Sequence, residues 1–477
     1  MVPLYLEYMG AEAYGLVGFF AMLQAWFTLL DMGLTPTVAR ETARFHGGAT
    51  EALNYRRLVR ALEGLFLVIA LVGGGAIFAS AGYIASNWLQ AAQLPIAEIQ
   101  TAVQLMAAIV ALRWIGGLYR GAISGAERLI WLGGYNSLIA TLRFIGVLLV
   151  LIFVGATPTI FFGYQLGVAV LELLGLMLQA NRQLPGIPEG KRIDWSWAPL
   201  KSVLKFSSTI AFVTLVWVLI TQTDKLILSK ILPLAEYGYF TLAVLVASGL
   251  MVISGPVGGA VMPRMVKLEA EGDHAGLIRI YRQATQLVAV IAGAATITLV
   301  FCAEPLLWAW TGDRALAHQT APILVLYALG NGIVAVSGFP YLLQYAKGDL
   351  RLHLIGNAGF VVLLVPSIIW AAREYGALGA GYVWLTMNLV AFVVWIPIVH
   401  RKFEPGLNLK WYFQDVLIIY LVASIAGYCL SSIVPHSDNR GGEVVIILGL
   451  GLLILLAAAL ASSVIRARAA VWLELRK

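Results

Sequence analysis

The sequence predicts an all-α membrane protein that crosses the bilayer many times. Of its 477 residues, 60% are hydrophobic and only 12% are charged. The mean hydropathy of +0.85 means that the chain carries more apolar surface than a water-soluble core of this length could cover. The apolar residues also gather in long runs separated by short polar breaks, which is the pattern of membrane-spanning helices.

We expect thirteen spans, whose spacing leaves no room for a soluble domain. Each apolar run is long enough to cross about 30 Å of hydrocarbon as a helix. The runs cover residues 13–34, 61–82, 101–125, 130–154, 157–179, 206–230, 237–262, 284–303, 320–345, 352–372, 377–399, 411–434 and 443–465.

The distribution of basic residues predicts the orientation of the spans. If residues 35–60 are cytoplasmic, alternate breaks should be rich in Lys and Arg and the others poor. The predicted cytoplasmic breaks hold 24 of the 32 basic residues, whereas the opposite breaks hold only Arg314, Arg373 and Arg440. The net charge of +7 is therefore a sign of membrane topology, and no nucleic-acid partner is expected.

The chain also contains an internal repeat at a constant offset of 223 residues. In both copies an acidic residue, Tyr and Gly open an apolar run, and the basic break that follows keeps its charges in register. The aligned residues are Tyr14 with Tyr237, Gly15 with Gly238, Arg44 with Lys267 and Arg56 with Arg279. Six spans, an even number, fit within the offset, so both copies enter the membrane the same way round, as parallel repeats do.

The first copy begins closer to the start of the chain than the second copy predicts. A complete span, residues 206–230, precedes the second motif, but only the stub MVPLYLEYM precedes the first. We expect that roughly 20 residues of a first helix are missing here, and that the natural chain or an upstream start codon supplies them. Restoring it would give 14 spans, arranged as two six-helix bundles and a C-terminal pair; the alternative is a chain of thirteen spans that begins outside. The expected parts are an N-terminal lobe at 1–192, a second lobe at 193–402, and a helix pair with a basic tail at 403–477.

Four stretches carry a resemblance to a known family. They are MGAEAYG, DMGLTPTVARETAR, SGAERLIWLGGYNSLIATLRFIGVLLVL and TQTDKLILSKILPLAEYGYFTLA. They resemble the polysaccharide-transporter branch of the multidrug/oligosaccharidyl-lipid/polysaccharide (MOP) exporter superfamily, which includes the flippases for O-antigen and exopolysaccharide units. The resemblance implies a flippase in the cytoplasmic (inner) membrane that moves an undecaprenyl-diphosphate-linked oligosaccharide to the outer leaflet by alternating access. It also implies a glycan polymerase and a chain-length regulator as partners, besides membrane lipids.

Charged residues in the middle of spans are the candidates for substrate binding. Each costs about 2.5–3.5 kcal/mol to insert, so those present usually line a cavity or pair with one another. Arg113, Arg143 and Glu172 lie near the centres of three spans, and Arg120 follows Arg113 by two helical turns and points the same way. We expect the three arginines to attract the diphosphate and Glu172 to balance one of them, or to take a coupling proton. The alternative is a structural Arg143–Glu172 pair. Glycines 116, 117 and 121 beside them allow close helix approach or room for a ligand.

Three other charged residues are weaker candidates for gating or coupling. Asp31 lies near the inner end of its span, where we expect it to pair with Arg40 or another basic residue. Asp224 and Lys225 lie near the outer end of theirs and could close an outer gate or anchor the helix at the membrane surface. Adjacent residues point to different faces of a helix, so we do not expect these two to pair simply with each other.

We expect a transporter and not an enzyme, with no catalytic residue, cofactor or metal site. Cys302 and Cys429 fit neither a disulfide framework nor a metal site, and no Walker loop is present. The alternatives are a lipid II flippase, a drug exporter of the same superfamily, and a membrane glycan polymerase or glycosyltransferase. A drug exporter should favour acidic cavity residues, and an enzyme of that kind usually needs a large outer loop. The longest outer break, residues 83–100, has one acidic residue, Glu98, and no Lys or Arg.

Overall fold

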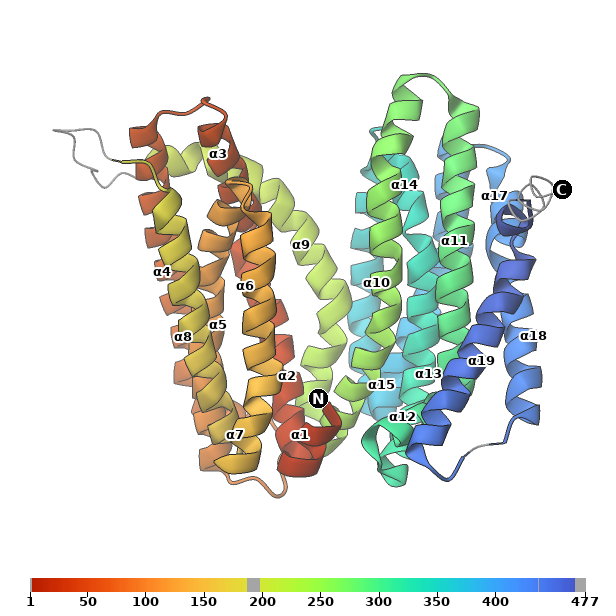
Figure 1. Ribbon diagram of the computed structural model, residues 1–477, viewed down its shortest axis with the longest axis horizontal. Helices are drawn as coiled ribbons and strands as arrows, with labels where there is room; N and C mark the ends of the chain where they lie inside the picture. Colours follow the sequence, from red (N-terminus) through yellow and green to blue (C-terminus); the bar gives the residue numbers. More distant parts are fainter. Residues whose placement is uncertain (1, 187–197, 436, 468–477) are drawn as a thin grey trace. The chain divides into compact units, whose positions relative to one another are not determined.

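The chain folds into two compact units of helices. The structure, a computed structural model, describes residues 2–186, 198–435 and 437–467, with side chains except at 198–211 and 213. Within these residues every regular element is a helix (Figure 1). The units are Met1–Gly238 and Tyr239–Lys477, called unit 1 and unit 2 below. The prediction of an all-α polytopic protein is confirmed.

Unit 1 holds the first nine α-helices of the described chain and the start of the tenth. These helices are α1 (Val2–Met9), α2 (Ala11–Phe27), α3 (Leu34–His46), α4 (Ala52–Tyr83), α5 (Ile96–Gly125), α6 (Leu129–Thr141), α7 (Val147–Phe153), α8 (Pro158–Gln183) and α9 (Ala198–Ile231). Three short segments join them: the 3₁₀ turn η1 (Thr28–Asp31) and the π-helical segments η2 (Ile84–Trp88) and η3 (Leu142–Gly146).

Helix α5 is the centre of unit 1, because α3, α4 and α8 all pack against it. Its side chains Ile99, Val103 and Met106 are fully buried. Glycine allows the approach of α3, since a Cβ on Gly121 would lie 2.6 Å from the backbone oxygen of Thr35. Of the two uses that we expected for the glycines near Arg113, close helix approach is confirmed at Gly121.

Unit 2 contains the remaining helices. They are α10 (Leu234–Ala270, which starts in unit 1), α11 (His274–Phe301), α12 (Ala303–Thr311), α13 (Arg314–Ser337), α14 (Phe339–Ala346), α15 (Arg351–Val390), α16 (Ile396–Phe403), α17 (Leu407–Lys410), α18 (Ile418–Ile433) and α19 (Arg440–Ala461). The π-helical segments η4 (Ala391–Trp395) and η5 (Trp411–Leu417) continue α15 and α17.

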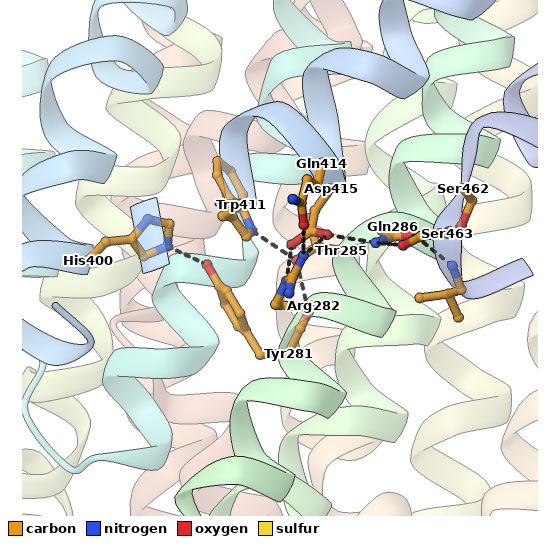
Figure 2. Close-up of polar contacts among 11 residues, drawn as sticks. Tyr281, Arg282, Thr285, Gln286, His400, Trp411, Gln414, Asp415, Ser462 and Ser463 are labelled. Carbon is orange, nitrogen blue, oxygen red and sulfur yellow. Dashed lines mark hydrogen bonds and ion pairs between the residues drawn. The ribbon is translucent and has the colours of Figure 1, made fainter. Parts of the chain in front are cut away.

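A buried polar network joins α11 to both ends of the C-terminal helix pair (Figure 2). Arg282 donates from Nε to Oδ2 of Asp415 at 2.6 Å and from Nη2 to Oδ1 at 2.9 Å. Gln286 donates to the same carboxylate at 2.6 Å and accepts from the Ser462 hydroxyl at 2.7 Å. Asp415 is fully buried, so these donors replace the water that its carboxylate loses on folding. The network attaches η5 and the end of α19 to the central helix of unit 2.

Eleven helical segments of the described chain are long and apolar enough to cross a membrane. Our thirteen predicted spans differ from these at two places. The predicted span at 206–230 lies in α9, many of whose side chains lie outside the described residues. The predicted spans at 352–372 and 377–399 fall in one segment, Arg351–Phe403. The count of thirteen, or of 14 with a restored first helix, stays a prediction.

The segment Arg351–Phe403 is an antiparallel hairpin. Its helical course breaks at Gly376, where φ is 58° and ψ is −138°. Three pairs of residues meet across the break at matching distances along the chain: Ala371 with Gly379, Gly356 with Trp395, and Asp349 with Lys402. A straight helix of 53 residues would be about 80 Å long, far more than a bilayer needs, whereas each arm of the hairpin has the length of one span.

Only part of the predicted division into lobes falls on residues that the structure describes. The expected boundary at residue 192 lies outside the described residues. The described helix α9, which we expected to open the second lobe, packs against α2, α3 and α4 and so belongs to unit 1. The three-part division and the parallel repeat stay predictions.

Candidate functional site

The central arginines of α5 converge on one carboxylate of α8. Nε of Arg113 lies 3.6 Å from Oε2 of Glu172, and Nη2 of Arg120 donates to Oε1 of the same carboxylate. The side chain of Glu172 is 5% exposed, that of Arg113 10% and that of Arg120 34%. The spacing of seven residues therefore places both arginines on the face of α5 that meets α8, as the sequence predicted.

Arg113 is held on three sides but keeps unused donors. Its Nη2 donates to Oε1 of Gln165 at 3.3 Å, and its guanidinium carbon lies 5.6 Å from the ring centre of Phe20. Its Nε and Nη1 are buried and have no hydrogen-bond partner in the described part of the chain. Buried donors of a charged group are costly to leave unpaired, so this guanidinium is ready to bind an acceptor.

Arg143 lies on the π-helical segment η3 and does not pair with Glu172. Its guanidinium carbon is 5.5 Å from the ring centre of Phe144, and no described residue is a hydrogen-bond partner of its buried Nε. Among the described residues Arg143 makes no ion pair, so the Arg143–Glu172 pair that we considered is wrong. The physical reason is that the two closer arginines of α5 already occupy the carboxylate.

Gln165 connects the two halves of this cluster and was missed in the sequence. Its Oε1 accepts from Arg113, and its Nε2 donates to the backbone oxygen of Arg143 at 2.9 Å. A signal was present, because Gln165 precedes Glu172 by seven residues and therefore lies on the same face of α8. Tyr135 was missed as well: its hydroxyl donates to the backbone oxygen of Leu171 at 2.8 Å and ties α6 to α8.

Asp31 has a local partner and no basic one. Its Oδ1 accepts from the Thr35 hydroxyl at 2.6 Å and from the Thr35 backbone N–H at 3.2 Å. Met32 and Gly33 adopt left-handed conformations, with φ of 43° and 72°, which turn the chain so that the carboxylate reaches the first turn of α3. In the described part of the chain Asp31 makes no ion pair, so the expected pairing with Arg40 is wrong.

Asp224 and Lys225 do contact each other, contrary to our expectation. Nζ of Lys225 lies 3.1 Å from Oδ1 of Asp224 and donates to the backbone oxygen of Thr221 at 2.6 Å. The long lysine side chain folds back along α9, and this reach overcomes the different directions in which adjacent residues leave a helix. The side chain of Asp224 is 4% exposed and that of Lys225 18%, and the choice between an outer gate and a surface anchor stays a prediction.

A match to a protein-family model identifies the family of the chain. The profile of the family described as polysaccharide biosynthesis protein matches residues 9–316. The chain belongs to this family. Membership of this polysaccharide biosynthesis family confirms the resemblance that the four sequence motifs carry, and it covers all of the arginine cluster.

Similar proteins agree with that membership. A Shigella flexneri protein, named as a candidate O-antigen transporter, is 20% identical over 376 residues, which cover 79% of this chain and 87% of the relative. The lipid II flippase MurJ in an inward closed conformation has a TM-score of 0.72 at 14% identity, over 96% of this chain and 95% of its own. An inward-facing multidrug resistance transporter of the MATE family has a TM-score of 0.67 at 14% identity, over 86% and 94%. Similarity at this identity is evidence of the fold, which the chain shares with both of these transporters.

Proposed function

We propose that this protein is a flippase that moves an undecaprenyl-diphosphate-linked oligosaccharide, an O-antigen or exopolysaccharide repeat unit, across the cytoplasmic membrane. The observation that carries the proposal is the pair of guanidinium groups of Arg113 and Arg143 in membrane-spanning helices of unit 1. Each has a buried N–H donor with no hydrogen-bond partner among the described residues. Membership of a polysaccharide biosynthesis family supports the glycan. The eleven candidate membrane spans of the described chain support transport across a membrane.

The chemistry of the substrate matches this cluster. Its diphosphate is anionic and its sugars are rich in hydroxyl groups, so both need polar partners in hydrocarbon, whereas the prenyl tail can stay in the lipid. A guanidinium fork binds phosphate oxygens with two parallel hydrogen bonds. Gln165 fixes Arg113 relative to Arg143, so the two can act on one diphosphate.

Glu172 has the role of an internal counter-ion in this proposal. It neutralises Arg113 and Arg120 when no substrate is bound, which lowers the cost of their burial. A bound diphosphate competes with the carboxylate for the same N–H groups. The released carboxylate is our candidate for a coupling proton, because an unpaired buried carboxylate is costly.

Alternating access completes the proposed cycle. The head group enters from the cytoplasmic side and leaves on the other side, while the tail slides past the helices in lipid. Asp31 and the Asp224–Lys225 pair remain candidates for gating or coupling, although each has a local partner in unit 1. A glycan polymerase and a chain-length regulator are the proposed partners at the outer face.

The arginine cluster also bears on the rival functions. A drug exporter for organic cations would need acidic residues where this chain has Arg113, Arg120 and Arg143, so the cluster disfavours it. Lipid II carries the same diphosphate, so a lipid II flippase must be separated by experiment. A membrane glycosyltransferase has no supporting observation among the described residues.

A strain that lacks the gene tests the proposal. We expect loss of surface polysaccharide and accumulation of the lipid-linked repeat unit on the inner leaflet, both reversed by the wild-type gene. Arg113→Gln and Arg143→Gln should fail to restore the glycan at equal expression. Arg128→Gln is the matched control, because Arg128 is an exposed arginine at the start of α6.

One outcome would contradict only the arginine site, and two would contradict the proposed function. Full rescue by both variants would remove the arginine site but keep the flippase. Accumulation of lipid II in place of the repeat unit would indicate the lipid II flippase. Unchanged glycan together with changed drug tolerance would indicate the exporter.

A further inference from the structure

The π-helical segment η3, which carries Arg143, is held through its backbone by side chains of α8. The Tyr164 hydroxyl donates to the backbone oxygen of Leu142 at 3.0 Å. Nε2 of Gln165 donates to the backbone oxygen of Arg143 at 2.9 Å. Two adjacent residues of α8 therefore bind two adjacent carbonyl groups at the start of η3.

The helical form of η3 decides the direction in which Arg143 points. A π-helical turn holds one more residue than an α-helical turn, and it is rare because its hydrogen bonds run from residue i to i+5. One residue corresponds to about 100° of rotation around an α-helix. If η3 returned to the α-helical form, α7 would turn by about this angle relative to α6, and the Arg143 side chain would turn as well. Contacts that hold η3 π-helical thus also set the direction of the guanidinium.

Two further contacts fit this arrangement. A Cβ on Gly146 would overlap the Tyr164 hydroxyl, so glycine leaves the room in which that hydroxyl reaches η3. From α1, the Tyr5 hydroxyl lies 3.4 Å from the backbone oxygen of Phe144, which is a longer contact. The Tyr5 ring packs edge-on against Phe161, with 5.4 Å between the ring centres. The segment is therefore held from α1 as well as from α8.

The segment η4 of unit 2 shows that such contacts do not by themselves mark a binding site. The Tyr412 hydroxyl donates to the backbone oxygen of Phe392 in η4, and η4 contains no charged residue. At η3 the same chemistry holds a residue with a guanidinium group. The buried Nε of Arg143 has no hydrogen-bond partner among the residues that the structure describes, so its direction decides which acceptor it can reach.

We propose that Tyr164 is a positioning residue of the diphosphate site and that it acts through Arg143. Its hydroxyl, together with the Gln165 amide, holds η3 π-helical and so sets the direction of the Arg143 fork. This inference rests on the proposed function, because it assigns how a ligand-binding arginine of that site is held. The alternative is that the Tyr164 hydroxyl only joins α8 to its neighbour, as the Tyr412 hydroxyl does in unit 2.

A double-mutant cycle separates the two roles. The probe is farnesyl diphosphate, a prenyl diphosphate without sugar, titrated by calorimetry into the protein in lipid nanodiscs. Tyr164→Phe keeps the ring and removes only the hydroxyl, and we expect it to weaken binding about fivefold, which corresponds to the loss of one hydrogen bond. In a protein that carries Arg143→Gln, where Arg113 still binds the probe, Tyr164→Phe should weaken binding no further.

The matched control is Tyr412→Phe, which removes a hydroxyl donor from a π-helical segment without a charged residue. Its dissociation constant for the probe should equal that of the wild type. If Tyr164→Phe weakens binding equally with and without Arg143, the positioning role is overturned and the proposed function stands. A wild-type protein that binds no farnesyl diphosphate would contradict the diphosphate site itself, and the positioning role with it.

Spin labels give a second measurement that needs no ligand. Leu149 on α7 and Leu174 on α8 are both exposed, so each position can carry a label. The labels are attached to cysteines at these positions, in a protein whose Cys302 and Cys429 are replaced by alanine. The distance distribution between them reports how α7 is turned relative to α8 within unit 1.

The double variant Tyr164→Phe with Gln165→Leu removes both short hydrogen bonds to η3. We expect it to shift or broaden the distance distribution in lipid nanodiscs. Tyr135→Phe should leave the distribution unchanged, because it removes a hydroxyl bond between α6 and α8 that lies outside η3. A double variant with the distribution of the wild type would overturn the proposal, since these side chains would then not hold η3.

Discussion

Nε of Arg113 lies 3.6 Å from Oε2 of Glu172, and both side chains are at least nine-tenths buried in unit 1. A pair of charges in this environment contributes little net stability as a pair, since both groups have lost their water. Removal of one partner is a different matter, because the other charge is then buried alone. This asymmetry makes the pair testable.

Glu172→Gln should destabilise the protein by about 3 kcal/mol, the cost of leaving a buried charge without its partner. Arg113 loses its counter-ion completely, whereas Arg120, at 34% exposure, can turn toward solvent. Thermal unfolding in detergent should show a lower midpoint. The double variant Arg113→Gln with Glu172→Gln should recover part of the loss. A single variant as stable as the wild type would mean that Glu172 does not neutralise these arginines.

Gln165→Leu should weaken the cluster by about 1–3 kcal/mol, because both Arg113 and the backbone oxygen of Arg143 lose a hydrogen-bond partner. Glycan export should fall with it. Gln183→Leu is the matched control on the same helix, since both polar atoms of that side chain are buried and have no hydrogen-bond partner among the residues that the structure describes. The control should be neutral or stabilising. Equal effects of the two substitutions would show that Gln165 only fills space.

Asp415→Asn should cost about 3 kcal/mol, because it leaves Arg282 facing an amide at the attachment of the C-terminal pair. Unfolding in detergent measures this loss. Asp438→Asn is the comparison, since Asp438 is fully exposed and its Oδ1 lies 3.8 Å from Nη2 of Arg314, which is largely exposed. Such a surface pair contributes almost nothing. If the two variants have the same unfolding midpoint, the network of Figure 2 does not hold the C-terminal helix pair in place.

The sequence predicted the parts of the site that follow from helical spacing. Arg113 and Arg120 share a face because they are two turns apart, and this held when Glu172 proved to be their common partner. The alternative Arg143–Glu172 pair failed, because spacing along the chain does not show which of several arginines a carboxylate on another helix meets.

Polar contacts between residues that are distant in the chain could not be predicted from the sequence. Asp415 sits at the start of an apolar run, and nothing in its neighbourhood indicates that its donors come from α11, some 130 residues earlier. The Lys225–Asp224 contact was missed because helix geometry fixes the direction of a Cβ and not the path of a four-carbon side chain. By contrast, the break between the two predicted spans at 352–372 and 377–399 was recognisable from Arg373, Glu374 and Gly376.

Acid should loosen the open end of the α15 hairpin. Hydrogen bonds from Lys402 and from the backbone N–H of Arg351 hold the pKa of Asp349 below its usual 3.8. Above pH 3.8 the carboxylate is ionised in the folded and in the unfolded chain, so its stabilising effect is complete. As the pH falls below 3.8 the unfolded chain binds the proton first, and the effect is lost as the pH approaches the lower pKa of the folded state.

Asp349→Asn measures this effect. The unfolding midpoint of the variant should lie below that of the wild type at neutral pH, and the two should converge in acid. A difference that is the same at every pH would assign the effect to packing.

Gly376→Ala should destabilise the hairpin by about 1–3 kcal/mol, since φ of 58° with ψ of −138° is a conformation that residues with a Cβ rarely adopt. Gly359→Ala, in the first arm, meets no atom within 4 Å and should be neutral or stabilising, because alanine favours a helix interior over glycine by about 1 kcal/mol. Unfolding in detergent compares the two. If Gly376→Ala is tolerated as well as Gly359→Ala, the chain does not need the left-handed turn at this point.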